Sequence, residues 1–197
     1  MNFVEDVREL IGHTPILHIR NTGITERVRL MAKLELFNPG GSVKDRMGVA
    51  LIKDAQERGL LKPGYTIVEA TAGNAGIGIA LAAIGMGYRV VFAVPEKFSI
   101  EKQMIMKALG AEIVHTPLAA GMKGAFEKVD ELLKTIPHSL CLSQFSNPAN
   151  PSAHYEQTGA EIYADLDGEI DYVVAGAGSG GTITGVLRYL KEKNPAV

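Results

Sequence analysis

The chain has 197 residues, 46% of them hydrophobic and 21% charged, and its formal net charge is -2, which is typical of a compact globular protein of one or two domains. Lysine and arginine number 20 against 22 acidic residues, and no basic run occurs. The sequence therefore predicts neither a nucleic-acid partner nor a membrane-surface partner.

The first ten residues, MNFVEDVREL, contain acidic side chains where an export signal needs a basic start and an apolar stretch. We therefore expect a cytoplasmic protein. The single cysteine, Cys141, cannot form an internal disulfide, which agrees with a reducing compartment. It lies in a short apolar run, so a buried strand residue is expected rather than a nucleophile.

Strands and helices alternate along the chain. Short apolar runs rich in β-branched residues predict strands over 29–36, 66–70, 89–94, 111–116, 139–143 and 171–176. Helices are expected to begin near Ser42, Asn74, Ser99, Gly121, Pro151 and Gly181. Alternating strands and helices predict an α/β fold with a mostly parallel sheet covered on both faces. The uncharged stretch between Glu69 and Arg89 contains five glycines and is expected to be interior rather than a membrane span.

A lysine stands in an unusual place in the segment FNPGGSVKDRMG, residues 37–48. The Pro-Gly-Gly-Ser turn is followed at once by a predicted helix with Lys44 in its first turn. The amino end of a helix carries partial positive charge, so it favours an anion and disfavours an ammonium group. Lys44 is therefore a candidate for a neutral, reactive amine.

The sequence AGAGSGGT, residues 175–182, follows a predicted strand and precedes a predicted helix. Ligands of parallel α/β sheets bind at such turns. The backbone N–H groups of Gly178, Ser179, Gly180 and Gly181, with the hydroxyls of Ser179 and Thr182, are candidates for a phosphate cradle. Alternatively, the turn is only a tight connection. The P-loop lysine is missing, so the pattern is a weak signal for nucleotide binding.

A phosphate cradle together with a reactive lysine indicates an aldehyde cofactor with a phosphate group, held as a Schiff base. Pyridoxal phosphate has both features. The motifs NPGGSVKDR, TAGNAGIGIA, SQFSNPAN and GAGSGGT, in this order, resemble those of the cysteine synthase and cystathionine β-synthase family of pyridoxal-phosphate enzymes, which have fold type II. The resemblance covers essentially the whole chain.

The resemblance implies a role for individual residues. Lys44 is the expected Schiff-base lysine, and Asn74 is expected to hydrogen-bond the cofactor's 3-hydroxyl group. The family's phosphate loop matches Gly178, Ser179, Gly180, Gly181 and Thr182. The substrate is expected to contact Thr71, Ala72, Gly73, Asn74, Ala75 and Gln144, of which Gln144 helps to hold the carboxylate.

The implied reaction is β-replacement on O-acetylserine or serine through an aminoacrylate, with Lys44 as the base that removes the Cα proton. The segment 95–117 is similar to bacterial O-acetylserine-dependent cystathionine β-synthases, which favours homocysteine as the acceptor and cystathionine as the product. A cysteine synthase that uses sulfide is the alternative. An inactive relative that only binds a partner or an amino acid is a third possibility.

The substrate loop departs from the family pattern Thr-Ser-Gly-Asn-Thr-Gly, because Ala72 and Ala75 replace two residues with hydroxyl groups. A hydrogen bond to a charged group contributes about 1.5–3 kcal/mol, so substrate affinity or selectivity should differ from that of an ordinary cysteine synthase. Compensation by water or by Thr71 is the alternative.

The resemblance also implies the domain organisation. Residues 41–147 are expected to form a small mobile domain, and 1–40 with 148–197 part of a large cofactor-binding domain that is incomplete in this chain. A homodimer is expected. The five histidines show no metal-binding spacing, so no metal site is predicted, and surface or capping roles are expected for all of them.

Overall fold

The computed structural model describes residues 3–20, 23, 27–71 and 73–197. A four-stranded sheet in the order β5-β4-β3-β6 forms one end of the molecule, and all its strand pairs are parallel. Its strands are β3 (Thr66–Ala70), β4 (Arg89–Pro95), β5 (Glu112–Thr116) and β6 (Ser139–Leu140). The α/β class predicted from the sequence is confirmed.

The helices begin close to the predicted positions. They are α1 (Lys44–Glu57), α2 (Asn74–Ala83), α3 (Ile100–Ala108), α4 (Gly121–Thr135), α5 (Ala149–Ala153), α6 (Ala160–Asp165) and α7 (Gly181–Lys193). A π-helical segment, His154–Gly159, joins α5 to α6, and short 3₁₀ helices lie at Val7–Leu10, Glu35–Phe37 and Leu118–Ala120. Ser99 illustrates why the helix starts could be predicted, because its Oγ accepts a hydrogen bond from the N–H of Lys102 and caps α3.

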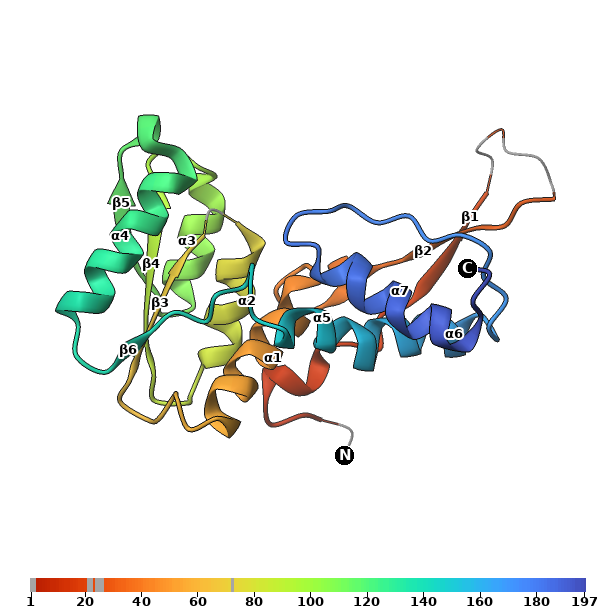
Figure 1. The fold of residues 1–197 in the computed structure, drawn as a ribbon, viewed down its shortest axis with the longest axis horizontal. Coiled ribbons are helices and arrows are strands. Elements are labelled where there is room, and N and C mark those ends of the chain that lie inside the picture. The colour runs from red at the N-terminus through yellow and green to blue at the C-terminus, as the bar shows by residue number, and fades with distance from the viewer. Residues whose placement is uncertain (1–2, 21–22, 24–26, 72) are drawn as a thin grey trace.

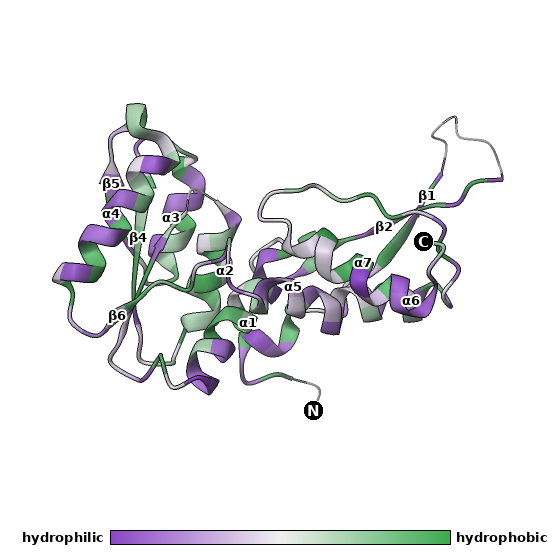
Figure 2. Ribbon diagram, in the orientation of Figure 1, coloured by the Kyte–Doolittle hydropathy of each residue, from purple (hydrophilic) through white to green (hydrophobic). Residues whose placement is uncertain are grey.

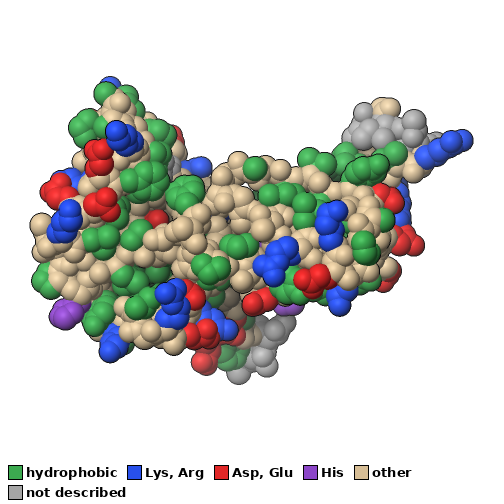
Figure 3. Space-filling view, in the orientation of Figure 1, with side chains coloured by type: hydrophobic (Ala, Val, Ile, Leu, Met, Phe, Trp, Pro, Cys, Tyr) green, Lys and Arg blue, Asp and Glu red, His purple; other side chains and the backbone are tan. Residues whose placement is uncertain are grey.

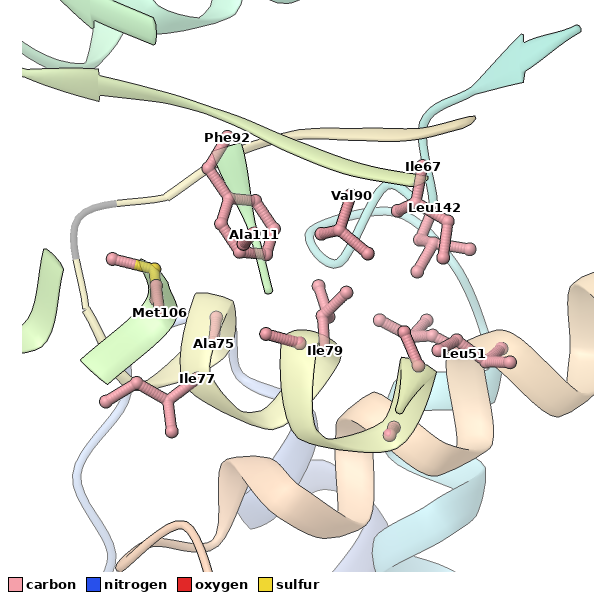
Figure 4. Packing of buried hydrophobic residues seen from close by; sticks show 14 of the residues in the cluster. Leu51, Ile67, Ala75, Ile77, Ile79, Val90, Phe92, Met106, Ala111 and Leu142 are labelled. Carbon is pink, nitrogen blue, oxygen red and sulfur yellow. The ribbon is translucent and has the colours of Figure 1, made fainter. Parts of the chain in front are cut away.

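Both faces of the parallel sheet are buried. Ile67, Val90 and Phe92 pack on one side with residues of α1 and α2 (Figure 4). Val68 and Val91, their neighbours along the strands, pack on the other side with α4. Because successive strand residues point to opposite faces, strands covered on both sides read as continuous apolar runs. Figure 2 shows the same apolar character along β4 and α2.

Two glycines set the contact between α1 and α2. A Cβ atom on Gly48 would clash with the carbonyl oxygen of Gly78, and a Cβ atom on Gly78 would clash with the carbonyl oxygen of Lys44. The two helix backbones therefore touch at this crossing. The contact fixes the first turn of α1 against α2.

The other end of the molecule contains the antiparallel pair β1 (Ile16–Ile19) and β2 (Leu30–Lys33) together with α5, α6 and α7 (Figure 1). A separate apolar cluster lies there, with Ile170, Val186 and Leu190 at its centre. Helix α1 lies between the two ends. The division into a domain of residues 41–147 and a domain of 1–40 with 148–197 stays a prediction.

Three predicted strands differ from the structure. Residues 171–176 form no strand, because no other described segment pairs with them, and Tyr172 and Val174 are 90% and 98% exposed. The strand expected over 139–143 ends at Leu140, which leaves Cys141 outside it. The strand expected over 29–36 ends at Lys33 and continues as the 3₁₀ helix Glu35–Phe37. Strand β1 was not predicted.

Charged side chains of both signs are interspersed on the face drawn in Figure 3, with apolar side chains between them. None of the helices in the described ranges is long and apolar enough to cross a membrane.

Candidate active site

A cavity of about 370 Å³ lies where β3 and β6 lead into the loops at their carboxyl ends. It is lined by Val43, Lys44, Ala70, Thr71, Gly73, Asn74, Ala75, Lys102, Met122, Gln144 and Phe145. The fold thus brings together six residues predicted from the sequence: Lys44, Thr71, Gly73, Asn74, Ala75 and Gln144. The predicted substrate residue Ala72 lies outside the described residues.

Lys44 is the first residue of α1, and its side chain is half-buried in the wall of the cavity. Burial lowers the pKa of its amine, because a charged ammonium loses hydration there. Within the described part of the chain, Nζ has neither a hydrogen-bond acceptor nor an ion-pair partner among the protein side chains. This shift has the direction that a neutral, reactive amine requires, and the reactivity of Lys44 stays a prediction.

The first turn of α1 is fixed by a buried arginine two residues after Lys44. Arg46 is fully buried and donates from Nε and Nη2 to Glu35 at 2.8 and 2.9 Å. It also donates from Nη1 and Nη2 to Glu161 at 2.6 and 2.8 Å. Lys33 Nζ lies 2.9 Å from the same Glu161 carboxylate. These contacts tie α1 to β2, to the 3₁₀ helix after it and to α6.

The loop between β3 and α2 is held by the hydroxyl of Thr71. Thr71 Oγ1 accepts hydrogen bonds from the N–H groups of Gly76 at 3.0 Å and Gly73 at 3.4 Å. Asn74 follows as the first residue of α2. Ala75 is buried, and its side chain packs in the same apolar cluster as Ile67 and Phe92. An apolar residue at this position therefore matches its surroundings.

Gln144 is buried and connects the first cavity to a second one of about 130 Å³, since it lines both. Its backbone carbonyl accepts a hydrogen bond of 2.8 Å from Asn150 Nδ2, which also donates to Ser179 Oγ at 3.0 Å. Asn150 thus joins the segment after β6 to the glycine-rich loop. Asn150 ends the motif SQFSNPAN, but no role was predicted for it.

The glycine-rich loop lies at the start of α7. Ser179, Gly180 and Gly181 line the second cavity, whereas Gly178 and Thr182 do not. Gly180 adopts a left-handed backbone with φ of 80°, which glycine accepts without strain. The side chain of Thr182 instead lies 3.3 Å from His154 Nε2. Its predicted contact with a phosphate stays a prediction.

The two ends of pyridoxal phosphate match these two cavities. The half-buried amine of Lys44 is suited to its aldehyde, and the start of α7 is suited to its phosphate, because the first N–H groups of a helix have no intrahelical acceptor. A Cβ atom on Gly178 would meet no atom within 4 Å, so the loop leaves room beside its backbone. The cavities share Gln144 and Phe145, so they adjoin one another.

His154 is fully buried, which makes the expected surface or capping role wrong for this histidine. Its Nδ1 lies 3.0 Å from Thr158 Oγ1, and its Nε2 faces Thr182. Burial, with the nearby charges of Lys44 and Arg46, lowers its pKa to about 4. His154 is therefore neutral at physiological pH, and its contact with Thr182 holds the end of the glycine-rich loop.

Cys141 lines neither cavity. Its thiol donates to Glu69 Oε2 at 3.3 Å. Burial and the adjacent Glu69 carboxylate raise its pKa to about 12, so the reactive thiolate is not available at neutral pH.

Comparison with known proteins identifies the family of the chain. The model of the family described as "Pyridoxal-phosphate dependent enzyme" matches residues 7–197. The O-acetylserine dependent cystathionine beta-synthase of Bacillus subtilis is 54% identical over the whole chain, which covers 64% of that protein. Cysteine synthase A of Escherichia coli is 48% identical over 95% of the chain, which covers 57% of that protein.

A solved structure agrees with these matches. The O-acetylserine dependent cystathionine beta-synthase of Helicobacter pylori superposes with a TM-score of 0.95 at 46% identity, over 100% of this chain and 65% of that one. The chain therefore spans less than two thirds of the length of these relatives. The resemblance and the type II fold that the sequence predicted are confirmed.

Proposed function

The chain belongs to the family of pyridoxal-phosphate dependent enzymes, and we propose that its protein catalyses β-replacement on O-acetylserine or serine, with homocysteine as the acceptor and cystathionine as the product. The observation that carries the proposal is the half-buried amine of Lys44 in a cavity shared with Asn74 and Gln144. Homodimerisation and a cytoplasmic location stay predictions.

The cofactor would be held at two places. Ser179, Gly180 and Gly181, with Gly178 and Thr182, would bind its phosphate through N–H and hydroxyl donors at the start of α7. Asn74 would hydrogen-bond its 3-hydroxyl group, and Lys44 would bind its aldehyde carbon. When bound, pyridoxal phosphate supplies an electron sink that stabilises negative charge at the substrate's Cα.

The side chains of the cavity then have separate tasks. Once the amino group of the substrate has replaced it at the aldehyde carbon, Lys44 Nζ would take the proton from Cα, and its lowered pKa favours the unprotonated amine that this step needs. Gln144 and the N–H groups of the loop around Gly73 and Asn74 bind the substrate carboxylate. Fixing the carboxylate there would bring the Cα proton of the substrate within reach of Lys44.

Sulfide as the acceptor, which gives cysteine, is the second candidate, because cysteine synthase A is also a close relative. An inactive binding protein is disfavoured by the joint presence of Lys44, Asn74, Gln144 and the glycine-rich loop.

The test is product formation by the full-length protein loaded with pyridoxal phosphate. With O-acetylserine, we expect more cystathionine from homocysteine than cysteine from sulfide, and Lys44→Ala should remove both products. Lys53→Ala is the control, because Lys53 is exposed on the same helix and should leave both rates unchanged. Cysteine as the main product would select the second candidate, and no product from the parent protein would refute both.

A further inference from the structure

A second lysine faces the same cavity as Lys44. Lys102 is the third residue of α3, is half-buried and lines the 370 Å³ cavity. A Cβ atom built on Gly73 would lie 3.6 Å from Lys102 Nζ and 3.9 Å from its Cδ. The side chain therefore reaches across to the loop between β3 and α2.

The cavity gives this ammonium group no counter-ion. The charged residues that line it are Lys44 and Lys102, and no aspartate or glutamate is among the lining residues. Across the described ranges, no carboxylate lies within 4 Å of Lys102 Nζ, whereas the neighbouring Glu101 accepts a hydrogen bond from Ser99 Oγ at 3.1 Å. A half-buried cation without a partner beside a cavity favours an anionic ligand there.

The backbone around Lys102 is fixed. Ser99 Oγ accepts from the Lys102 N–H at 3.4 Å, and Gln103 Nε2 donates to the Phe98 carbonyl at 2.5 Å. Gln103 Oε1 also lies 2.8 Å from His115 Nε2 on β5. The start of α3 is therefore anchored to the sheet, and the base of the Lys102 side chain has a defined position.

We propose that Lys102 is a specificity-determining residue that binds a carboxylate of an amino-acid substrate in this cavity, an inference that rests on the proposed function. Its charge supplies an interaction that the apolar side chain of Ala75 cannot make. The carboxylate belongs either to the amino acid that carries the leaving group or to a thiol amino acid that acts as acceptor. Sulfide has no carboxylate, so the two sources can be separated.

The first measurement is binding, without turnover. L-methionine, which has the carboxylate but no leaving group on Cβ, is titrated by calorimetry into the full-length, cofactor-loaded protein. Lys102→Gln should bind it about 10-fold more weakly, since an ionic hydrogen bond is lost. Lys102→Arg should retain most of the affinity. Lys107→Gln, an exposed position on the same helix, is the control and should bind like the parent.

The second measurement separates the two carboxylates. If Lys102 binds the first substrate, Lys102→Gln raises the KM for O-acetylserine with sulfide as acceptor and leaves kcat nearly unchanged. If it binds the acceptor, only the KM for homocysteine rises. Unchanged methionine affinity together with unchanged KM values would overturn the inference. If the parent protein shows no β-replacement, the proposed function fails. The inference about Lys102 is then tested by binding alone, and equal methionine affinity in the parent and in Lys102→Gln would overturn it.

Discussion

At the scale of single residues, the lowered pKa of Lys44 follows from its surroundings. Its amine is half-buried, and burial lowers its pKa. Its position in the first turn of α1 acts in the same direction, because the helix dipole disfavours a cation there. Lys102, the other lysine that lines the cavity, cannot stabilise an ammonium group on Lys44, because like charges repel.

Thr182 tests where the phosphate binds. Thr182→Val should weaken pyridoxal-phosphate affinity about 10-fold, because a hydrogen bond to a charged group is lost. It should also lower the melting temperature of the cofactor-free protein, because the buried His154 Nε2 loses its partner. Fluorescence titration with the cofactor measures the affinity. Thr135→Val, at the exposed end of α4, is the control. Equal affinity in Thr182→Val would place the phosphate away from this hydroxyl.

The site residues whose roles were predicted differ from those whose roles were missed in how far along the sequence their contact partners lie. Lys44, Asn74, Gln144 and Ser179 each belong to a short local motif, so a single segment identifies them. Arg46 and Asn150 also end two of these motifs, but their partners Glu161 and Ser179 are 115 and 29 residues away. Their roles depend on contacts between elements, which no local pattern shows. Lys102 lines the cavity only because α3 packs beside the loop after β3.

At the scale of elements, α1 is placed by its crossing with α2 and by the ion pairs of Arg46. The crossing is close because Gly48 and Gly78 have no side chains. On the opposite side, Arg46 binds the carboxylates of Glu35 and Glu161. Together these contacts set the position of Lys44 in the cavity.

Gly78→Ala should disturb that position. The added methyl group would meet the carbonyl oxygen of Lys44, so the helices must move apart, which we expect to cost about 1–3 kcal/mol of unfolding free energy. Denaturant unfolding measures the cost. The rate of β-replacement should fall by more than the loss of folded protein accounts for. A variant with unchanged stability and rate would show that the crossing does not position Lys44.

Glu161 gives a prediction about pH. Burial raises the pKa of Glu161, but hydrogen bonds from Arg46 and Lys33 outweigh burial and hold the pKa at about 2, below its ordinary value of 4.5. Because the folded-state pKa is depressed, the stabilisation is present above pH 4.5 and is lost as the pH falls towards 2. The shift corresponds to about 3 kcal/mol.

Glu161→Gln should therefore lower the free energy of unfolding at pH 7 by about 3 kcal/mol and flatten its fall between pH 4.5 and 2. Urea unfolding at several pH values measures both effects. Glu169→Gln is the control, because its ion pair with Arg29 is exposed and should contribute little. An equal loss of unfolding free energy in Glu161→Gln and Glu169→Gln would mean that the ion pair of Glu161 with Arg46 stabilises the fold no more than an exposed ion pair does.

At the scale of the whole molecule, the alternation of strands and helices predicted the parallel sheet, because buried strands and amphipathic helices have distinct periodicities. The segment 171–176 shows the limit of that reasoning. Its β-branched residues favour extended backbone, but a strand also needs a partner, and no described segment supplies one. The antiparallel pair of β1 and β2 depends on a long-range pairing that the sequence pattern did not reveal.

The two ends of the molecule meet at the candidate site. Asn74, Gln144 and Lys102 come from the end with the parallel sheet, and the glycine-rich loop comes from the end with α7 (Figure 1). Lys44 lies between them at the start of α1. In the proposed site, one cofactor with a phosphate and an aldehyde would contact both ends.

Chemical trapping can show whether Lys44 holds the cofactor. Borohydride reduces the C=N bond between pyridoxal phosphate and a lysine to a stable amine, so the modified residue can be identified by peptide mass spectrometry. In the full-length protein, we expect the phosphopyridoxyl group on the peptide containing Lys44 and no modified lysine in Lys44→Ala. A modification at another lysine in the parent protein, or a protein that binds the cofactor without any trapped bond, would contradict the account.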